Sequence, residues 1–135
     1  MARLSDLIKY LNENNTPHLV LRHSPAFSAH EVAAATHVPD SVLAKTVVLH
    51  IDGKYWLAVL RADHRIDEKR VKRSFGAEHV HLAREEELAS LFPDCEVGAM
   101  PPFGNLYALP TVVDRSLAED EEIVFNACTH TESVR

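Results

Sequence analysis

Residues 46–60 read TVVLHIDGKYWLAVL, and this stretch decides the fold of the chain. Valine, isoleucine, tyrosine and tryptophan favour strands, and the Asp52-Gly53 pair in the middle favours a tight hairpin turn. The two runs on either side of that pair are apolar at nearly every position. Strands of this kind are typical of the interior of a sheet, with other elements covering both faces. The sequence therefore predicts a central β-hairpin.

Helical and extended segments alternate irregularly around this hairpin. An amphipathic leucine pattern predicts an opening helix over residues 4–11, and Ser28 with Glu31 forms the capping box of a second helix that runs to His37. Further helices are expected over residues 66–75 and 84–92, and further strands over residues 18–23, 80–82, 106–109, 111–114 and 122–126. This order predicts an α+β fold with a mixed, largely antiparallel curved sheet flanked by helices.

The composition is that of a globular protein, and its length predicts a single domain over residues 1–135. A chain of this size needs no metal or disulfide to fold. Its 20 acidic and 14 basic residues give a formal net charge of −6. This balance argues against a nucleic-acid coat protein, which would carry a broad basic field. A local contact with a nucleic-acid end stays open.

Cys95 and Cys128 are the only two cysteines of the chain and form no CxxC pattern. Two separate, reduced thiols in an intracellular protein are therefore expected. The N-terminus turns polar at once, and no apolar run reaches transmembrane length. We expect neither a signal peptide nor a membrane partner, and a cytoplasmic location.

The segment Val-Gly-Ala-Met-Pro-Pro-Phe-Gly at residues 97–104 is a candidate binding loop. Proline fixes φ and removes a backbone donor, while glycine reaches backbone angles that other residues avoid. Such a loop is stiff, and the N–H groups that remain point in defined directions. Rigid loops on a scaffold often hold a ligand. A purely structural turn is the alternative.

Lys45 and His130 are candidate polar residues of such a site. Lys45 stands at the entrance to the first hairpin strand, next to the core, where a lysine needs a partner. It either snorkels to water or holds its ammonium at the mouth of a pocket, where it would bind a phosphate or a ribose hydroxyl. His130 lies in a polar loop beyond the last expected strand, where a histidine is usually only solvated.

Other chemistries have less support in the sequence. His79 and His81 would share one face of a strand as two metal ligands, but no third ligand stands at a characteristic spacing. We therefore expect no metal and no cofactor. A cluster of four basic residues is either the solvated face of a helix or a contact for a phosphate backbone. Its members are Lys69, Arg70, Lys72 and Arg73.

Three motifs follow one another in a specific order: Leu-Ala-Lys-Thr at residues 43–46, a GxxxP motif from Gly98 to Pro102 with Phe103-Gly104 behind it, and the His130 loop. This order resembles the YbaK-type aminoacyl-tRNA editing family. The family comprises free-standing deacylases and the editing domain inserted in bacterial-type prolyl-tRNA synthetases. The resemblance extends over essentially the whole chain, including the opening helix and the hairpin.

The resemblance implies hydrolysis of the ester that joins a wrong amino acid to the 3′ end of a tRNA, without a metal. By analogy, Lys45 would anchor the terminal adenosine or the neighbouring phosphate. The loop that begins at Gly98 would offer backbone groups to the aminoacyl carbonyl and ammonium. His130 would line the pocket that selects amino acids by the size of their side chains. Further substrate contacts are expected from Thr46, Ala99, Met100, Pro101, Pro102, Phe103, Gly104 and Thr129.

The expected protein is thus a deacylase acting in trans on a mischarged tRNA, with a prolyl acceptor carrying a small amino acid as its substrate. A prolyl-tRNA synthetase is a second candidate partner, and DNA is not expected to bind. A catalytically silent module that binds aminoacyl-tRNA or a synthetase is the alternative. Two features depart from the family: Cys128 stands where members commonly have glycine, and many members continue beyond the position of Arg135.

Overall fold

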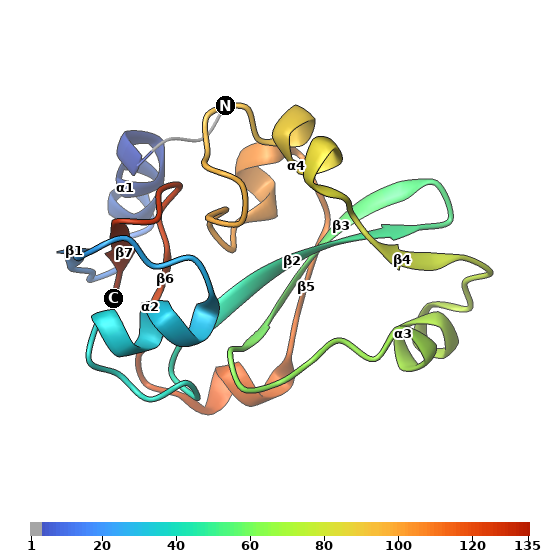
Figure 1. Cartoon of the computed structure of the whole chain (residues 1–135), viewed down its shortest axis with the longest axis horizontal. Coiled ribbons are helices and arrows are strands. Elements are labelled where there is room, and N and C mark those ends of the chain that lie inside the picture. The colour runs from blue at the N-terminus through green and yellow to red at the C-terminus, as the bar shows by residue number, and fades with distance from the viewer. Residues whose placement is uncertain (1–3) are drawn as a thin grey trace.

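The structure is a computed structural model that describes residues 4–135, and the predicted hairpin lies at its centre (Figure 1). Strands β2 (Ala44–Ile51) and β3 (Lys54–Arg61) pair antiparallel along their whole length. They are the inner strands of a four-stranded sheet of order β4-β2-β3-β5. Strand β4 (Val80–Leu82) runs antiparallel to β2, and β5 (Thr111–Val113) runs parallel to β3. The interior position predicted for the hairpin is confirmed.

A second, three-stranded sheet stands at one end of the hairpin. It consists of β1 (Val20–Arg22), β7 (Glu132–Val134) and β6 (Phe125–Asn126), in the order β1-β7-β6 with antiparallel pairing. An isolated parallel bridge between Leu43 and Val124 joins this end to the start of β2. The predicted α+β fold with mixed, largely antiparallel pairing is confirmed, and the pairing is divided between two sheets.

Within residues 4–135, four α-helices surround the sheets (Figure 1). Helix α1 (Leu4–Glu13) lies beside the three-stranded sheet, and α2 (Ala29–Ala35) begins at the predicted capping box, in which the Glu31 N–H donates to Ser28 Oγ at 3.1 Å. Helix α3 (Glu68–Phe75) begins later than expected because the Asp67 side chain caps it. Helix α4 is Glu85–Leu91. Among the helices of residues 4–135, none has the length and apolar character needed to cross a bilayer.

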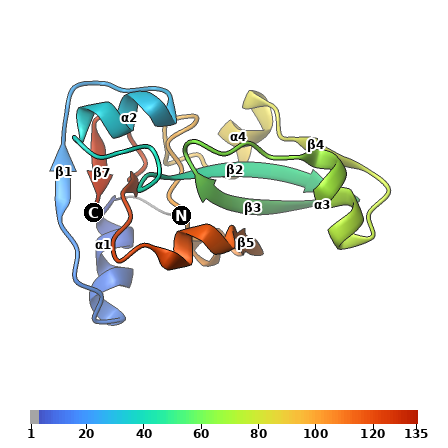
Figure 2. The same cartoon turned by 90° about the horizontal axis from the view of Figure 1, so that it is seen from below.

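The two faces of the hairpin are covered by different elements. Figure 2 shows β2 and β3 running side by side along the molecule. On one face, Val48 and Leu57 pack against α4 and Met100. On the opposite face, Leu49 and Ala58 pack against α3 and the segment that precedes it. Since both strands are covered on both sides, their nearly continuous apolar sequence is explained.

Two expectations from the sequence are wrong. Residues 106–109 are not a strand: Gly104–Tyr107 forms a short 3₁₀ helix, closed by Ala108 in the left-handed conformation at φ 56°. A second 3₁₀ helix spans Arg115–Glu119. His130 does not lie beyond the last strand, because β7 follows it and pairs with both β1 and β6. The His130 loop is therefore fixed at both ends by a sheet.

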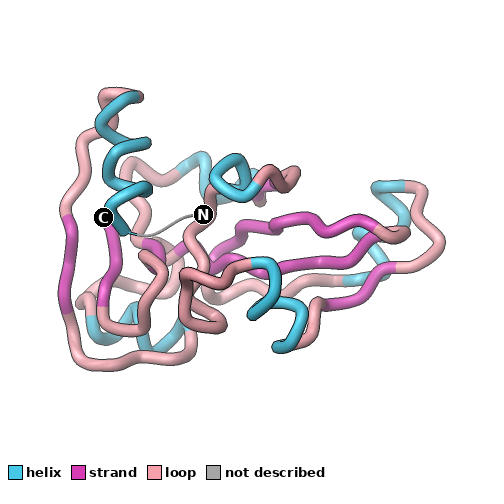
Figure 3. The backbone as a smooth tube through the Cα atoms, turned by 90° about the horizontal axis from the view of Figure 1, so that it is seen from above, coloured by secondary structure: helices cyan, strands magenta, loops and turns pink. Residues whose placement is uncertain are grey.

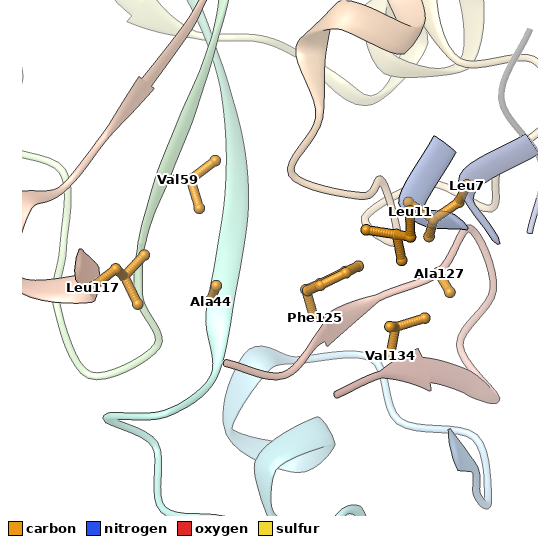
Figure 4. Packing of buried hydrophobic residues seen from close by; sticks show 8 residues of the cluster. All are labelled: Leu7, Leu11, Ala44, Val59, Leu117, Phe125, Ala127 and Val134. Atoms are coloured by element: carbon orange, nitrogen blue, oxygen red, sulfur yellow. The ribbon is translucent and has the colours of Figure 1, made fainter. Parts of the chain in front are cut away.

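A core cluster joins the two sheets (Figure 4). Leu7 and Leu11 of α1 point toward Phe125 and Val134 of the three-stranded sheet. Ala44 and Val59, at the start of β2 and the end of β3, belong to the same cluster, with Ala127 and Leu117. Helix α1 is thus part of the same core as the residues that precede His130.

The hairpin turn supplies a testable contribution to stability. Asp52 and Gly53 both have positive φ, 45° and 84°, as a tight hairpin turn requires. The Asp52 carboxylate accepts hydrogen bonds from the backbone N–H groups of Glu78 and His79, at 3.1 and 2.8 Å. These bonds lower the pKa of Asp52 and tie the turn to the segment before β4. The ionised carboxylate therefore stabilises the fold, and this contribution is lost as the pH falls through the lowered pKa.

Asp52→Asn is expected to keep the turn, because asparagine also accepts positive φ. It should lower the melting temperature at neutral pH, since a neutral amide accepts these hydrogen bonds more weakly than a carboxylate. The difference from wild type should shrink at acidic pH, as the pH falls through the lowered pKa of Asp52 and the wild-type carboxylate is protonated. Thermal melts followed by circular dichroism from neutral to acidic pH test this. A gap that stays constant with pH would contradict it.

Candidate functional site

The GxxxP loop has the stiff, pre-shaped form predicted from its glycines and prolines. Residues 93–103 form neither helix nor strand (Figure 3). A tight turn opens the loop: the Ala99 N–H donates to the Glu96 carbonyl at 3.0 Å, and Gly98 has a φ of +88°. The four residues that follow Gly98 are all buried. Their side chains anchor this part of the loop in the core.

The backbone donors of this loop are few. The Ala99 N–H is taken by the turn, and the Gly104 N–H donates to Thr111 Oγ1 at 3.1 Å. The two prolines have no N–H. Within residues 4–135, the N–H groups of Val97, Gly98, Met100 and Phe103 have no hydrogen-bond acceptor. Two of these four donors, those of Gly98 and Met100, lie within the GxxxP motif itself.

His130 lies directly against Gly98. A Cβ atom built on Gly98 would stand 3.8 Å from His130 Cε1. The His130 side chain is 13% exposed, and its ring packs against the Phe27 ring with the centroids 4.7 Å apart. Glu96 Oε2 accepts the His130 backbone N–H at 3.3 Å and lies 3.7 Å from His130 Nε2. Two residues predicted from distant parts of the sequence are thus brought together.

Glu96 and Phe27 are site residues that the sequence analysis missed. Glu96 stands two positions before Gly98 in the GxxxP loop. Its side chain accepts a hydrogen bond from the His130 backbone and so ties the two loops together. Phe27 is 67% exposed and directly precedes the N-cap of α2. Their signals in the sequence were a carboxylate beside the GxxxP motif and a large aromatic residue before a capping box, and neither pattern is specific.

The expectation of two separate thiols is wrong, because Cys95 and Cys128 form a disulfide. The Glu96 N–H donates to the Cys128 carbonyl at 2.8 Å, and the Cys128 N–H donates to the Ala99 carbonyl at 2.9 Å. These bonds bring the two segments side by side, with the cysteine Cα atoms 4.3 Å apart. Cys128 has a φ of +73°, which explains physically why a glycine suits this position in the resembled family.

Tyr107 covers the disulfide from the 3₁₀ helix. Its hydroxyl lies 3.0 Å from Cys95 Sγ, and its ring packs edge-on against Phe92, with the centroids 4.4 Å apart. Burial raises the pKa of Tyr107 to about 12. The hydroxyl therefore stays protonated at neutral pH and remains a hydrogen-bond donor toward the sulfur.

Lys45 belongs to a second polar group. Its Nζ donates to the His64 carbonyl, so the structure gives this half-buried lysine a partner. Burial lowers the pKa of Lys45, the nearby charge of Arg65 lowers it further, and Asp63 acts in the opposite direction. His64 Nδ1 lies 3.3 Å from a carboxylate oxygen of Asp114. This group thus combines an ammonium with an imidazole and two carboxylates.

A small apolar cluster connects the two groups. It contains Ala26, Val32 and Leu43. The Ala26 N–H donates to the His130 carbonyl at 2.9 Å, and Leu43 stands two residues before Lys45 on the same face of the strand. The segment before α2 thus contacts the His130 loop, and its apolar cluster extends to the residue two positions before Lys45.

The comparisons with known proteins can now be set beside this geometry. The family described as "Aminoacyl-tRNA editing domain" matches residues 23–135, which include Lys45, the GxxxP loop and His130. This chain belongs to the aminoacyl-tRNA editing domain family. The family connects it with the proofreading of aminoacyl-tRNA in translation.

Among curated proteins, this editing domain is similar to two proline–tRNA ligases. It is 34% identical over 98 residues to the ligase of Bacillus cytotoxicus, covering 73% of this chain and 16% of the ligase. It is 30% identical over 99 residues to the ligase of Bacillus mycoides, covering 73% of this chain and 17% of the ligase. The chain thus matches only a small part of the length of these relatives.

Solved structures share the fold of this editing domain. A hypothetical protein, APE2540, superposes with a TM-score of 0.81 at 25% identity, covering 95% of this chain and 85% of the other. A structure provisionally described as a trans-editing enzyme for prolyl tRNA synthetase has a TM-score of 0.82 at 21% identity, covering 98% and 84%. The predicted editing-domain fold is confirmed.

The remaining candidate residues are distributed unevenly in this editing domain. Thr46 lies half-buried opposite Val59, and Thr129 donates from its hydroxyl to Glu132 Oε1 at 3.1 Å. The basic cluster is exposed on α3, but only Arg70 of its four members lines the groove between α3 and the sheet. Within residues 4–135, no group of three histidine, cysteine, aspartate or glutamate side chains is arranged to hold a metal ion.

Proposed function

We propose that this editing domain is a deacylase that acts in trans on a mischarged tRNA. It would hydrolyse the ester of a small amino acid, with tRNA-Pro as the expected acceptor and without a metal. The observation that carries the proposal is the contact between His130 and Gly98, next to the two unpaired backbone donors of the GxxxP motif. In this arrangement the backbone donors can polarise the carbonyl of an aminoacyl ester, and the packed His130 ring limits the space for the amino-acid side chain.

The chemistry requires no strong nucleophile, because an aminoacyl ester is already activated. Water held in attack geometry beside the carbonyl removes part of the barrier through orientation alone. The N–H groups of Gly98 and Met100 would donate to the oxyanion that develops, at about 3 kcal/mol for each well-placed donor. Lys45 would hold the terminal adenosine or its phosphate, with its ammonium already positioned by the His64 carbonyl.

Selection would follow from the rigidity of the His130 wall. The His130 backbone is bound to Glu96, its ring is packed between Phe27 and Gly98, and the loop behind it is held by the Cys95–Cys128 disulfide. If the His130 side chain cannot move, amino acids too large for the pocket beside it are excluded. One methylene group changes discrimination by about 1–3 kcal/mol, so a rigid wall can separate amino acids that differ only slightly in size.

The test is hydrolysis of a panel of tRNAs with a prolyl acceptor that carry alanine, cysteine, serine, threonine or proline. We expect one small amino acid to be removed at least about tenfold faster than proline, as a single size step allows. The rate should be unchanged by EDTA, which controls for a bound metal. If no member turns over but tRNA still binds, the protein is the catalytically silent module. Loss of activity with EDTA would contradict the metal-free mechanism.

A further inference from the structure

A groove of about 500 Å³ lies between α3 and strands β3 and β5. Apolar side chains from both sides form its floor, among them Leu60, Ile66 and Val112. Three arginines from different segments stand along it: Arg65 before α3, Arg70 on α3, and Arg115 directly after Asp114. The groove is on the face of the hairpin opposite α4 and Met100. We call it the α3 groove.

The three arginines of the α3 groove are exposed and have no ion pair within residues 4–135. Four other arginines are paired with carboxylates at 2.8–3.8 Å, namely Arg22, Arg61, Arg84 and Arg135, whereas Arg73 of α3, outside the groove, also has no ion pair within residues 4–135. The formal net charge of the chain is −6, so carboxylates are plentiful. Unpaired guanidinium groups gathered at one groove of an acidic protein indicate an anionic partner.

The two carboxylates in the α3 groove are already committed to the backbone. Asp67 caps α3 and accepts the N–H groups of Lys69 and Arg70, at 3.0 and 3.2 Å. Asp114 accepts the Ser116 N–H at 2.9 Å, and this bond lowers the pKa of Asp114. Both carboxylates keep their charge, but two negative charges offset the three arginine charges only in part.

The α3 groove begins next to Lys45. Lys45 stands directly opposite Leu60 in the β2–β3 register, and residues opposite one another share a face of the sheet. Leu60 forms part of the groove floor. The charge of Arg65 is also close enough to lower the pKa of Lys45. A chain of positive charges therefore leads from Lys45 through Arg65 into the groove.

We propose that the α3 groove binds the phosphate backbone of the tRNA acceptor strand, with Arg65, Arg70 and Arg115 in contact with successive phosphates. This inference rests on the proposed function, because it assumes that the 3′ end of the tRNA reaches Lys45. The planar guanidinium group binds a phosphate through two parallel hydrogen bonds, which a lysine cannot do. The acidic protein would thus contact the phosphates of its RNA through Lys45 and the arginines of the α3 groove.

The decisive variant is Arg70→Ala/Arg115→Ala, which empties the groove of two charges and leaves Lys45 and Arg65 in place. Arg73→Ala is the matched control, since Arg73 is an arginine of the same helix but does not line the groove. Two substrates separate binding from chemistry: alanyl-tRNA with a prolyl acceptor, and the alanyl ester of adenosine, which has no acceptor strand. Binding of uncharged tRNA-Pro, measured over a salt series, adds a readout that needs no catalysis.

The double variant should lose about tenfold or more in kcat/KM on the alanyl-tRNA, through KM, because two charge-assisted contacts are removed. It should act on alanyl-adenosine like wild type, and the salt slope of tRNA binding should fall by about 1 to 2. Equal losses on both substrates, or a salt slope like that of Arg73→Ala, would overturn the proposal. If wild type hydrolyses neither substrate, the amino acid that it removes in the panel above replaces alanine in both; if it removes none, the proposed function fails, while the salt series of tRNA binding still tests the groove.

Discussion

Replacing Gly104 with alanine is expected to destabilise the fold by more than about 4 kcal/mol, which is a large part of the roughly 5–15 kcal/mol that stabilises a typical domain. A methyl group at this position would overlap Thr111 Oγ1 and the Leu109 carbonyl oxygen, and would lie 3.1 Å from Leu57 Cδ1. None of these neighbours is free to move. Leu57 and Thr111 are paired between β3 and β5, and the Leu109 N–H donates to the Gly104 carbonyl at 2.9 Å.

Chemical unfolding monitored by circular dichroism measures this loss, and Gly53→Ala and Gly76→Ala provide matched controls. Both of these glycines have positive φ, but an added Cβ would meet nothing within 4 Å. Their substitution should cost only the conformational strain, about 1–2 kcal/mol. A Gly104→Ala protein that unfolds like these two variants would show that the crowding around Gly104 relaxes easily. An insoluble Gly104→Ala protein beside two folded controls would agree with the prediction.

Gly98 is set apart by its backbone conformation rather than by lack of space around it. The structure leaves an added Cβ in ordinary contact with His130, at 3.8 Å, so space is not the limit. The cost arises instead from the φ of +88°, which alanine adopts only with strain. The motif identifies the residue, but only the backbone conformation explains why it is glycine.

Local signals carried most of the fold prediction. The Asp52-Gly53 turn and the Ser28 capping box depend on neighbours within a few residues, and both are confirmed. The expected strand over residues 106–109 is wrong because its apolar residues serve packing rather than pairing. Leu106 and Tyr107 belong to two different core clusters. A short apolar run does not reveal which way the chain turns.

The site was harder to predict because its contacts join distant segments. Glu96 and His130 are 34 residues apart, and the disulfide closes a separation of 33 residues. No periodicity or spacing in one segment reports a partner that far away. Lys45, Gly98 and His130 became candidates through local features of their segments, and only the resemblance to a family suggested that they act together.

Lys45→Ala is expected to reduce deacylation by about 100-fold or more, the usual effect of removing a group that holds charge in a preorganised site. The ammonium is the one charge of the site that is both half-buried and held by a backbone carbonyl, that of His64. Lys45→Met should be nearly as inactive as Lys45→Ala, because it keeps the apolar stem but not the charge. Lys45→Arg should recover only part of the activity, since a guanidinium group has a different shape.

The fold should survive these changes, because the Lys45 side chain lies at the edge of the core rather than within it. Lys54→Ala is the matched control: Lys54 is an exposed lysine at the other end of the same hairpin. Its melting temperature and its activity should both stay close to wild type. A Lys45→Met protein with wild-type turnover would remove the lysine charge from the mechanism. A Lys45→Ala protein that melts far below Lys54→Ala would mean that the lysine stabilises the hairpin, and its loss of activity would then say nothing about tRNA.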